Sequence, residues 1–348
     1  MKLWRLIPFL LLSALLTGCG KDWGKDTPGS QRPISFSSGV SVTTKGIKPD
    51  DPTVLIDVGN EASIFGTRVY DDIPTPVFSN RVLRCDSRPN PSTPSLEYSS
   101  VWSYTPVEYW EDNGDYYFAA VFPYSGENVN IDNTYVLNVS YSAGDNTDMM
   151  VARAHQDAAV SKEPVNLTFK HTTAAVRFLF GKSSSSDDDQ YSITAFRLEN
   201  FISSGDFSMA TRVTEAPTIT TNNWSVGSTY TTLFTWPENP GDSKFITHPS
   251  DASDPDGYTP MGWYYMVPQT LSPDARVRFS VSYNNGAPVE TVLNLYGVVD
   301  HTSESGTSWL PNCVYNYFIT LNQSGLDLTV RATPWDQVQV TTDDFNFE

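Results

Sequence analysis

The chain has 348 residues, of which 39% are hydrophobic, 13% aromatic and 18% charged, and its formal net charge is −18. An acidic balance of this size repels nucleic acid, so no nucleic-acid partner is expected. The abundance of aromatic residues, Thr, Ser and Val is typical of a β-rich secreted protein rather than a disordered one. The length suggests two domains, because one core rarely grows beyond ~250–300 residues.

The N-terminal segment has the pattern of a secretory signal peptide. Lys2 and Arg5 come before or at the start of an apolar run over 6–16, and small residues follow. This run is shorter than the ~20 residues that span a bilayer comfortably. It ends in Leu16-Thr17-Gly18-Cys19, which resembles a bacterial lipobox. The resemblance implies cleavage between Gly18 and Cys19, with residues 1–18 as the signal peptide.

Cys19 is therefore expected to be the lipid-bearing N-terminus of the mature chain. The lipobox implies two or three acyl chains, such as palmitate, and each buried CH₂ contributes ~0.8 kcal/mol, so one chain alone would hold only marginally. Residues 19–32 are rich in Lys, Asp, Gly, Ser and Pro, which indicates a flexible tether. Lys21 and Asp22 resemble the surface-export signal of some Gram-negative lipoproteins. They imply a lipid-anchored protein of the outer membrane, exposed at the cell surface.

Two further cysteines, Cys85 and Cys313, lie far apart in the sequence. A disulfide would need them close in space, which the sequence does not show, and two buried thiols are the favoured interpretation. The chain has no C-x-x-C pair, so it carries no zinc or redox motif of that kind.

Apolar residues two positions apart predict short strands along the first half of the chain. These strands are expected at 34–42, 54–58, 63–70, 101–105, 116–122 and 135–141. A mostly polar stretch over 157–164 follows and is a candidate domain boundary. We therefore expect an N-terminal β-sandwich over 33–163.

The second half shows the same pattern, although it weakens between Ser203 and Pro260. Strands are expected at 165–169, 174–180, 193–201, 263–267, 277–283, 289–295, 313–321 and 326–330. Asn284-Asn285-Gly286 separates two cleanly alternating runs, and its Asn-Gly pair predicts a hairpin whose two central turn residues, Asn285 and Gly286, have positive φ. A second hairpin is expected across 322–325. The regular spacing of strands and turns predicts a C-terminal β-sandwich over 164–348.

Several phrases, in this order and spacing, resemble the fimbrillin-like pilins that build type V pili. They are Trp102-Ser103, Tyr109-Trp110, Tyr117-Phe118-Ala119-Ala120, Leu167-Thr168-Phe169-Lys170-His171, Ala174-Ala175-Val176-Arg177-Phe178, Met266-Val267-Pro268-Gln269-Thr270-Leu271, Cys313-Val314-Tyr315-Asn316-Tyr317 and the segment from Val330 to Trp335. The resemblance implies an all-β fold of two tandem transthyretin-like β-sandwich domains. It also implies a lipoprotein precursor whose partners are other pilin subunits.

The resemblance further implies assembly by strand exchange. In this family a trypsin-like protease removes the first strand, and the open groove accepts a strand from a neighbouring subunit, which restores backbone pairing and apolar burial. Here the strand would be Ile34 to Val42, and Lys45-Gly46 in the following Gly- and Pro-flanked loop is the expected cut. Arg32 is a poorer cut site because Pro33 follows it. The alternative is an ordinary strand and an uncut loop.

No motif marks a catalytic, metal-binding or cofactor-binding site, so no enzyme activity and no cofactor are expected. Trp102, Trp110, Trp263 and Trp335 lie in or beside strand patterns, where core packing is expected. Trp224 and Trp236 lie in the irregular segment and are the candidate ligand-facing aromatics.

The sequence thus predicts a structural subunit or adhesin of a cell-surface type V pilus. A monomeric surface lipoprotein that binds glycan is the alternative. The sequence leaves open whether the subunit is stalk, tip or anchor, and it does not identify a receptor.

Overall fold

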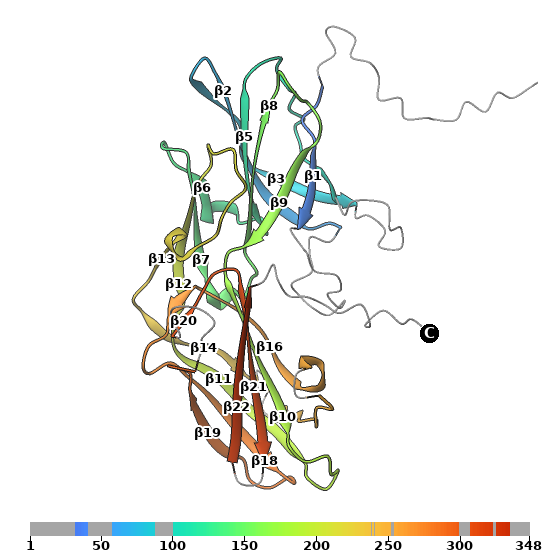
Figure 1. Ribbon diagram of the computed structural model, residues 1–348, viewed down its shortest axis with the longest axis vertical. Coiled ribbons are helices and arrows are strands. Elements are labelled where there is room, and N and C mark those ends of the chain that lie inside the picture. Colours follow the sequence, from blue (N-terminus) through green and yellow to red (C-terminus); the bar gives the residue numbers. More distant parts are fainter. Residues whose placement is uncertain are drawn as a thin grey trace, which may run out of the picture.

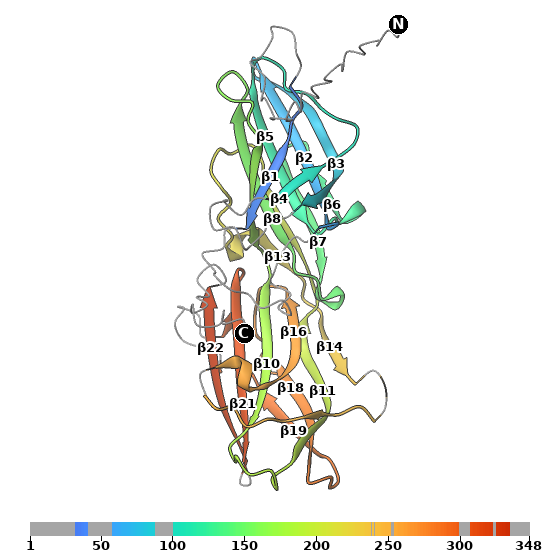
Figure 2. The ribbon, with the colours of Figure 1, turned by 90° about the vertical axis from the view of Figure 1, so that its right-hand side faces the viewer.

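The computed structural model describes residues 32–40, 58–87, 100–237, 239, 241–251, 254–298, 307–322 and 325–334. Within these residues the chain is all-β, with strands joined by loops and short 3-10 turns, so the predicted fold class is confirmed. Figures 1 and 2 show an elongated molecule with a barrel at one end and a pair of packed sheets at the other. None of the helices in this part of the chain is long and apolar enough to cross a membrane.

Seven strands close into a barrel at the upper end of Figure 1, in the order β1-β4-β3-β2-β5-β8-β9. Neighbouring strands are antiparallel, except that β1 and β9 run parallel. The strands are β1 (Phe36–Val40), β2 (Glu61–Tyr70), β3 (Ile73–Ser87), β4 (Ser100–Ser103), β5 (Asp115–Phe122), β8 (Met150–Asp157) and β9 (Val165–His171). The barrel therefore depends on β1 for its closure.

A second sheet, in the order β13-β12-β7-β6, covers one side of the barrel. It contains β6 (Val129–Ile131), β7 (Val136–Ser142), β12 (Ser204–Ala210) and β13 (Trp224–Val226). Leu137, Val139 and Tyr141 on β7 are buried while the residues between them are more exposed, as their alternation predicts.

Strand β5 belongs to the barrel, and the second sheet covers its outer face, so β5 contributes to a core on each side. Its residues Tyr116, Phe118 and Ala120 belong to the core inside the barrel, whereas Ala119 and Val121 belong to the core shared with the second sheet. This explains the dense apolar run of β5, because a strand covered on both sides needs no polar face.

Two sheets packed face to face form the lower end of the molecule (Figure 1). One has the order β16-β10-β21-β22, and the other has the order β14-β11-β18-β19 with β15 paired to β11. Their strands are β10 (Ala174–Lys182), β11 (Tyr191–Ile202), β14 (Tyr230–Trp236), β15 (Lys244–Phe245), β16 (Thr259–Met266), β18 (Arg276–Tyr283), β19 (Val289–Asn294), β21 (Cys313–Asn322) and β22 (Gly325–Pro334). Rings from both sheets meet in the core, with the Phe178 and Phe196 centroids 5.3 Å apart and those of Phe180 and Phe279 5.0 Å apart.

The remaining elements are short. A two-stranded ribbon joins β17 (Gln269–Thr270) to β20 (Ser308–Trp309). The 3-10 turns are η1 (Gly126–Asn128), η2 (Ala143–Asp145), η3 (Thr221–Asn223) and η4 (Pro255–Gly257).

Strand pairing crosses the predicted division between 163 and 164. Strand β9 follows that point in the sequence but pairs with β1 and β8 in the barrel. Strand β12 likewise returns to pair with β7. The domain limits of 33–163 and 164–348 remain a prediction.

The two predicted hairpins are present. β18 pairs with β19 and β21 with β22, both antiparallel. Cys85 and Cys313 form no disulfide with each other, and the expected burial holds for Cys85 but only in part for Cys313. Cys85 is buried in the barrel core, whereas Cys313 is partly buried against the other core.

Candidate functional site

Strand β1 lies between two strands that are far from it in sequence. Along one side Phe36 is in register with Trp102 on the short strand β4. Along the other side β1 runs parallel to β9, from Phe36 beside Val165 to Val40 beside Phe169. Figure 2 shows β1, in blue, crossing the front of the barrel between its neighbours. Both backbone edges of β1 are therefore used for closure.

The side chain of Phe36 fills an aromatic socket inside the barrel. Its ring meets those of Phe78, Tyr104 and Phe118 at centroid distances of 5.6, 5.8 and 5.4 Å, all in edge-to-face geometry. Ile34 is buried in the same core. Edge-to-face aromatic pairs stabilise beyond their buried area, so this socket favours an aromatic ring at the Phe36 position.

The hydroxyl of Tyr104 fixes the backbone at the start of this strand. It donates a 2.7 Å hydrogen bond to the carbonyl oxygen of Ile34. Burial raises the pKa of Tyr104 to about 12, so the hydroxyl stays protonated at physiological pH and can donate this hydrogen bond.

Hydrogen bonds also hold the residues just before β1 against the barrel. The backbone N–H of Ile34 donates to the carbonyl of Glu108 at 2.9 Å, and the N–H of Trp110 donates to the carbonyl of Arg32 at 2.9 Å. The Arg32 guanidinium lies 3.0 Å from the Glu163 carboxylate. That ion pair is exposed and contributes little, so the backbone bonds and the buried rings dominate.

Sequence reasoning identified the strand but missed its socket. The predicted limits of 34–42 contain β1, which is observed over Phe36–Val40. Phe78 lies in a segment for which the sequence predicts no strand. The contact of Tyr104 with Ile34 could not be predicted either, because periodicity indicates which face of a strand is buried but not which residues it contacts. Gly18, Cys19, Lys45 and Gly46 lie outside the described residues.

The two candidate ligand-facing aromatics are packed against the core. The indole N–H of Trp224 donates to the carbonyl of Thr172 at 2.9 Å, and its ring meets Tyr141 and Phe207 edge to face. Trp236 is partly buried against the same core, with the Lys244 ammonium 5.8 Å from its ring centroid. These contacts give both residues a packing role, and a ligand-facing role remains a prediction. Trp102 and Trp110 are buried, as expected.

Within the part of the chain that the structure describes, no group of three or more His, Cys, Asp or Glu side chains is placed to hold a metal ion. Around β1, the structure shows two strand edges, those of β4 and β9, and an apolar socket, all occupied by β1 itself.

The fold and this site define an all-β protein whose barrel is closed by its own first strand. The model of the fimbrillin-like family matches residues 87–335, so the chain belongs to the fimbrillin-like family. It is therefore a pilus-type structural protein of the cell surface, and its family is structural rather than enzymatic.

Solved structures of two Bacteroides proteins have a similar fold. A candidate cell adhesion protein from Bacteroides uniformis ATCC 8492 is 13% identical with a TM-score of 0.54, covering 89% of this chain and 100% of that chain. Another from Bacteroides ovatus ATCC 8483 is 15% identical with a TM-score of 0.52, covering 88% of this chain and 98% of that chain. At these identities the likeness shows the fold alone. A comparison with curated proteins found no match.

Proposed function

We propose that this chain is a subunit of a cell-surface type V pilus that assembles by exchange of its first strand. The precursor is exported as a lipoprotein, acylated on Cys19, and then cut at Lys45-Gly46, which releases β1. A strand from a neighbouring subunit takes the place of β1 between β4 and β9. The observation that carries this proposal is the position of β1 as the closing strand of the barrel, with Phe36 in a closed aromatic socket.

Loss of β1 would expose a surface that only another strand restores. The facing edges of β4 and β9 would lose their pairing, and the socket would lose Phe36 and Ile34. Burial of each such side chain contributes about 1.5–3 kcal/mol, and unmade backbone hydrogen bonds add to the cost. An incoming extended strand with an aromatic residue at the Phe36 position would recover both contributions.

Cleavage explains why the precursor would not exchange strands early. While β1 remains part of the same chain, its effective concentration at the groove is on the order of mM, and a separate strand competes poorly. A cut after β1 breaks its only covalent link to the barrel and so ends this advantage. Proline follows both Arg32 and Lys48 and hinders cleavage there, whereas Gly46 follows Lys45, so Lys45 is the preferred residue for a trypsin-like protease in this stretch.

The test uses soluble protein that starts at Gly20 and a low dose of trypsin. Mass spectrometry locates the cut, and size exclusion over a range of protein concentrations reports assembly. We expect an early cut after Lys45, followed by polymers whose amount rises with concentration. Lys45→Ala should block both the cut and the polymers, and Lys48→Ala is the matched control that should block neither.

A competitor peptide separates strand exchange from other association. A synthetic peptide of residues 33–44 should occupy the open groove and suppress polymers after cleavage. The same peptide with Phe36→Asp should not, because a carboxylate would be buried in the aromatic socket. Cleavage at Lys45 without any change in size would contradict assembly by exchange and favour the monomeric alternative. Polymers that resist the peptide would contradict the role of the β1 groove.

A further inference from the structure

A second concave site lies at the end of the molecule opposite the barrel. It is an open surface cavity of about 420 Å³, a volume within the ~300–1,000 Å³ range of small-molecule sites. Its lining residues are Lys182, Asp187, Gln190, Tyr191, Phe245 and Ile246. They come from the end of β10, the start of β11 and the segment at β15. The loop between β10 and β11 forms the lower end of the molecule in Figures 1 and 2.

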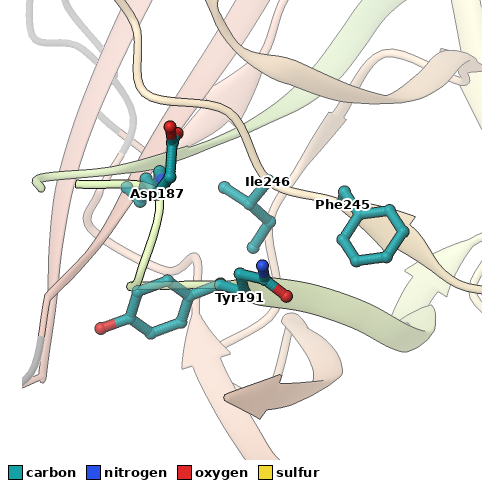
Figure 3. A pocket seen from close by; sticks show the side chains of 6 residues that line it. Asp187, Tyr191, Phe245 and Ile246 are labelled. Carbon is teal, nitrogen blue, oxygen red and sulfur yellow. The ribbon is translucent and has the colours of Figure 1, made fainter. Parts of the chain in front are cut away.

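The cavity combines an apolar surface with polar groups. Figure 3 shows the rings of Tyr191 and Phe245 with Ile246 between them in the view, and Asp187 on another side of the pocket. Tyr191 and Ile246 are buried, whereas Phe245 is 65% exposed. A single exposed apolar side chain needs no explanation by itself. Here the exposed ring borders a cavity, so its face is available to a ligand.

The floor of the cavity is fixed by backbone hydrogen bonds. The N–H of Ile246 donates to the carbonyl of Tyr191 at 2.9 Å, and the N–H of Lys182 donates to the carbonyl of Thr247 at 2.9 Å. These bonds hold β15 and the residues after it across the ends of β10 and β11, so the lining is formed before any ligand arrives.

Lys182 supplies a buried donor. The residue is only 9% exposed, and its ammonium donates to the carbonyl oxygens of Ser186 and Asp189 at 2.8 and 2.9 Å. A lysine ammonium has three donors, so one is left beyond these two bonds. Among the described residues, no carboxylate lies within 4.0 Å of this ammonium in an ion pair.

The mixture of charges narrows the class of ligand. A cation would meet Lys182, and an anion would meet Asp187. A purely apolar ligand would leave the Lys182 ammonium and the Gln190 amide without water. A neutral ligand with several hydroxyls can accept from Lys182 and Gln190 and donate to Asp187.

We propose that this pocket binds a neutral pyranose saccharide, with one face of the sugar ring against Phe245 and its hydroxyls bonded to Lys182, Gln190 and Asp187. The C–H groups on one face of a pyranose carry partial positive charge and meet the negative face of an aromatic ring. This site is separate from the β1 groove and does not depend on strand exchange.

The experiment is saturation-transfer NMR on the uncut protein from Gly20 onward, with methyl pyranosides of glucose, galactose, mannose, fucose and N-acetylglucosamine, and with glucuronate as the anionic comparison. We expect at least one neutral glycoside to bind with a Kd in the millimolar range. Phe245→Ala should weaken that binding at least tenfold, and Gln190→Ala should weaken it several-fold. Tyr296→Ala removes an aromatic ring that is 45% exposed elsewhere on the surface and should have no effect.

Three results would overturn the proposal. They are the absence of binding by every neutral glycoside, binding that Phe245→Ala leaves unchanged, and tighter binding of glucuronate, which would indicate an anion site at Lys182. Phe245 is exposed, so its removal should not unfold the protein, and an unchanged thermal midpoint verifies this. Because the chain stays uncut, failure here leaves the pilus proposal intact.

Discussion

The hydroxyl of Tyr104 donates a hydrogen bond to the carbonyl oxygen of Ile34 at 2.7 Å, across 70 positions of sequence. This contact ties the segment after β4 to the residue that leads into β1. The proposed exchange of β1 has to break it, so it offers a direct measure of how firmly the first strand is held.

Tyr104→Phe should loosen β1 without removing the ring from the socket. We expect a loss of about 1 kcal/mol in the free energy of unfolding, as for one neutral hydrogen bond. Hydrogen exchange at the amides of β1 should rise, while exchange in β18 stays unchanged. Equal exchange at β1 in both proteins would show that the Tyr104 hydroxyl does not hold the strand.

The same pair predicts a difference at alkaline pH. Burial raises the pKa of Tyr104 to about 12 from an ordinary value of 10.0, so the folded state favours the protonated form. The stabilisation is therefore complete below pH 10 and is lost as the pH rises toward about 12. The stability gap between the wild type and Tyr104→Phe should therefore close over that window. Urea unfolding at pH 8, 10 and 11.5 measures it, and a constant gap would contradict the assignment.

Phe36→Ala should destabilise the barrel far more than an exposed change nearby. Loss of a buried Phe side chain costs about 3–5 kcal/mol, because the socket made by Phe78, Tyr104 and Phe118 is left partly empty. Val101→Ala on the adjacent strand β4 is the matched control, since Val101 is exposed, and should cost under 1 kcal/mol. Denaturant unfolding measures the loss of stability in each variant. Similar losses for both variants would contradict a stabilising role for the socket.

The sequence predicted the strands better than their partners. The turn after β18 shows how well local chemistry works: Asn284 and Asn285 have φ of 46° and 58°, and the N–H of Gly286 donates to the carbonyl of Tyr283 at 2.8 Å. The Asn-Gly pair predicts positive φ at Asn285 and Gly286, whereas the structure has it at Asn284 and Asn285. The turn is centred on the two asparagines, because Asn tolerates the left-handed region and Gly286 closes the turn.

Pairing between distant segments had no signal in the sequence. The parallel contact of β1 with β9 joins Phe36 to Val165, and β12 reaches back to β7 through Phe207 and Val139. Alternation indicates which face of a strand is buried but is silent on which strand lies beside it. For the same reason the irregular segment around Trp224 was expected to face solvent, although its ring packs on Tyr141 and Phe207.

Glu199→Gln should weaken the lower pair of sheets in a pH-dependent way. The Glu199 carboxylate accepts hydrogen bonds from Arg278, Arg197 and Arg276 at 2.8, 2.7 and 2.6 Å. These bonds, those from Arg278 first, lower its pKa to about 2 from 4.5. The charged form is favoured by folding, so its contribution is present above pH 4.5 and is lost as the pH falls toward about 2.

We therefore expect Glu199→Gln to cost about 1–3 kcal/mol at pH 7 and progressively less as the pH falls below 4.5. Glu290→Gln is the matched control, because Glu290 contacts Arg278 at 2.6 Å but is 53% exposed. It should cost under 1 kcal/mol. Urea unfolding at pH 7 and pH 3 compares the two. A loss for Glu199→Gln that is equal at both pH values would mean that packing, and not the ion-pair network, accounts for it.

Asn146→Ala should weaken the connection between the two ends of the molecule. Asn146 follows η2, and its side chain donates to the carbonyl of Trp263 at 2.9 Å and accepts from the N–H of Tyr265 at 3.0 Å, both on β16. Its φ is 47°, which an alanine adopts only with strain. We expect a loss of about 2–3 kcal/mol, of which the two hydrogen bonds account for most.

Asn146→Gly separates the two causes, because glycine removes the hydrogen bonds but accepts the positive φ. The free energy of unfolding of Asn146→Gly should be about 1 kcal/mol higher than that of Asn146→Ala and still lower than that of the wild type. Denaturant unfolding followed by tryptophan fluorescence and by far-UV circular dichroism gives the loss and also tests cooperativity. If Asn146 couples the ends, the two probes should diverge in the variants and coincide in the wild type, since a barrel released from β16 can unfold separately. Coincident transitions with no loss of stability in either variant would show that the ends are held together by their shared apolar core without this contact.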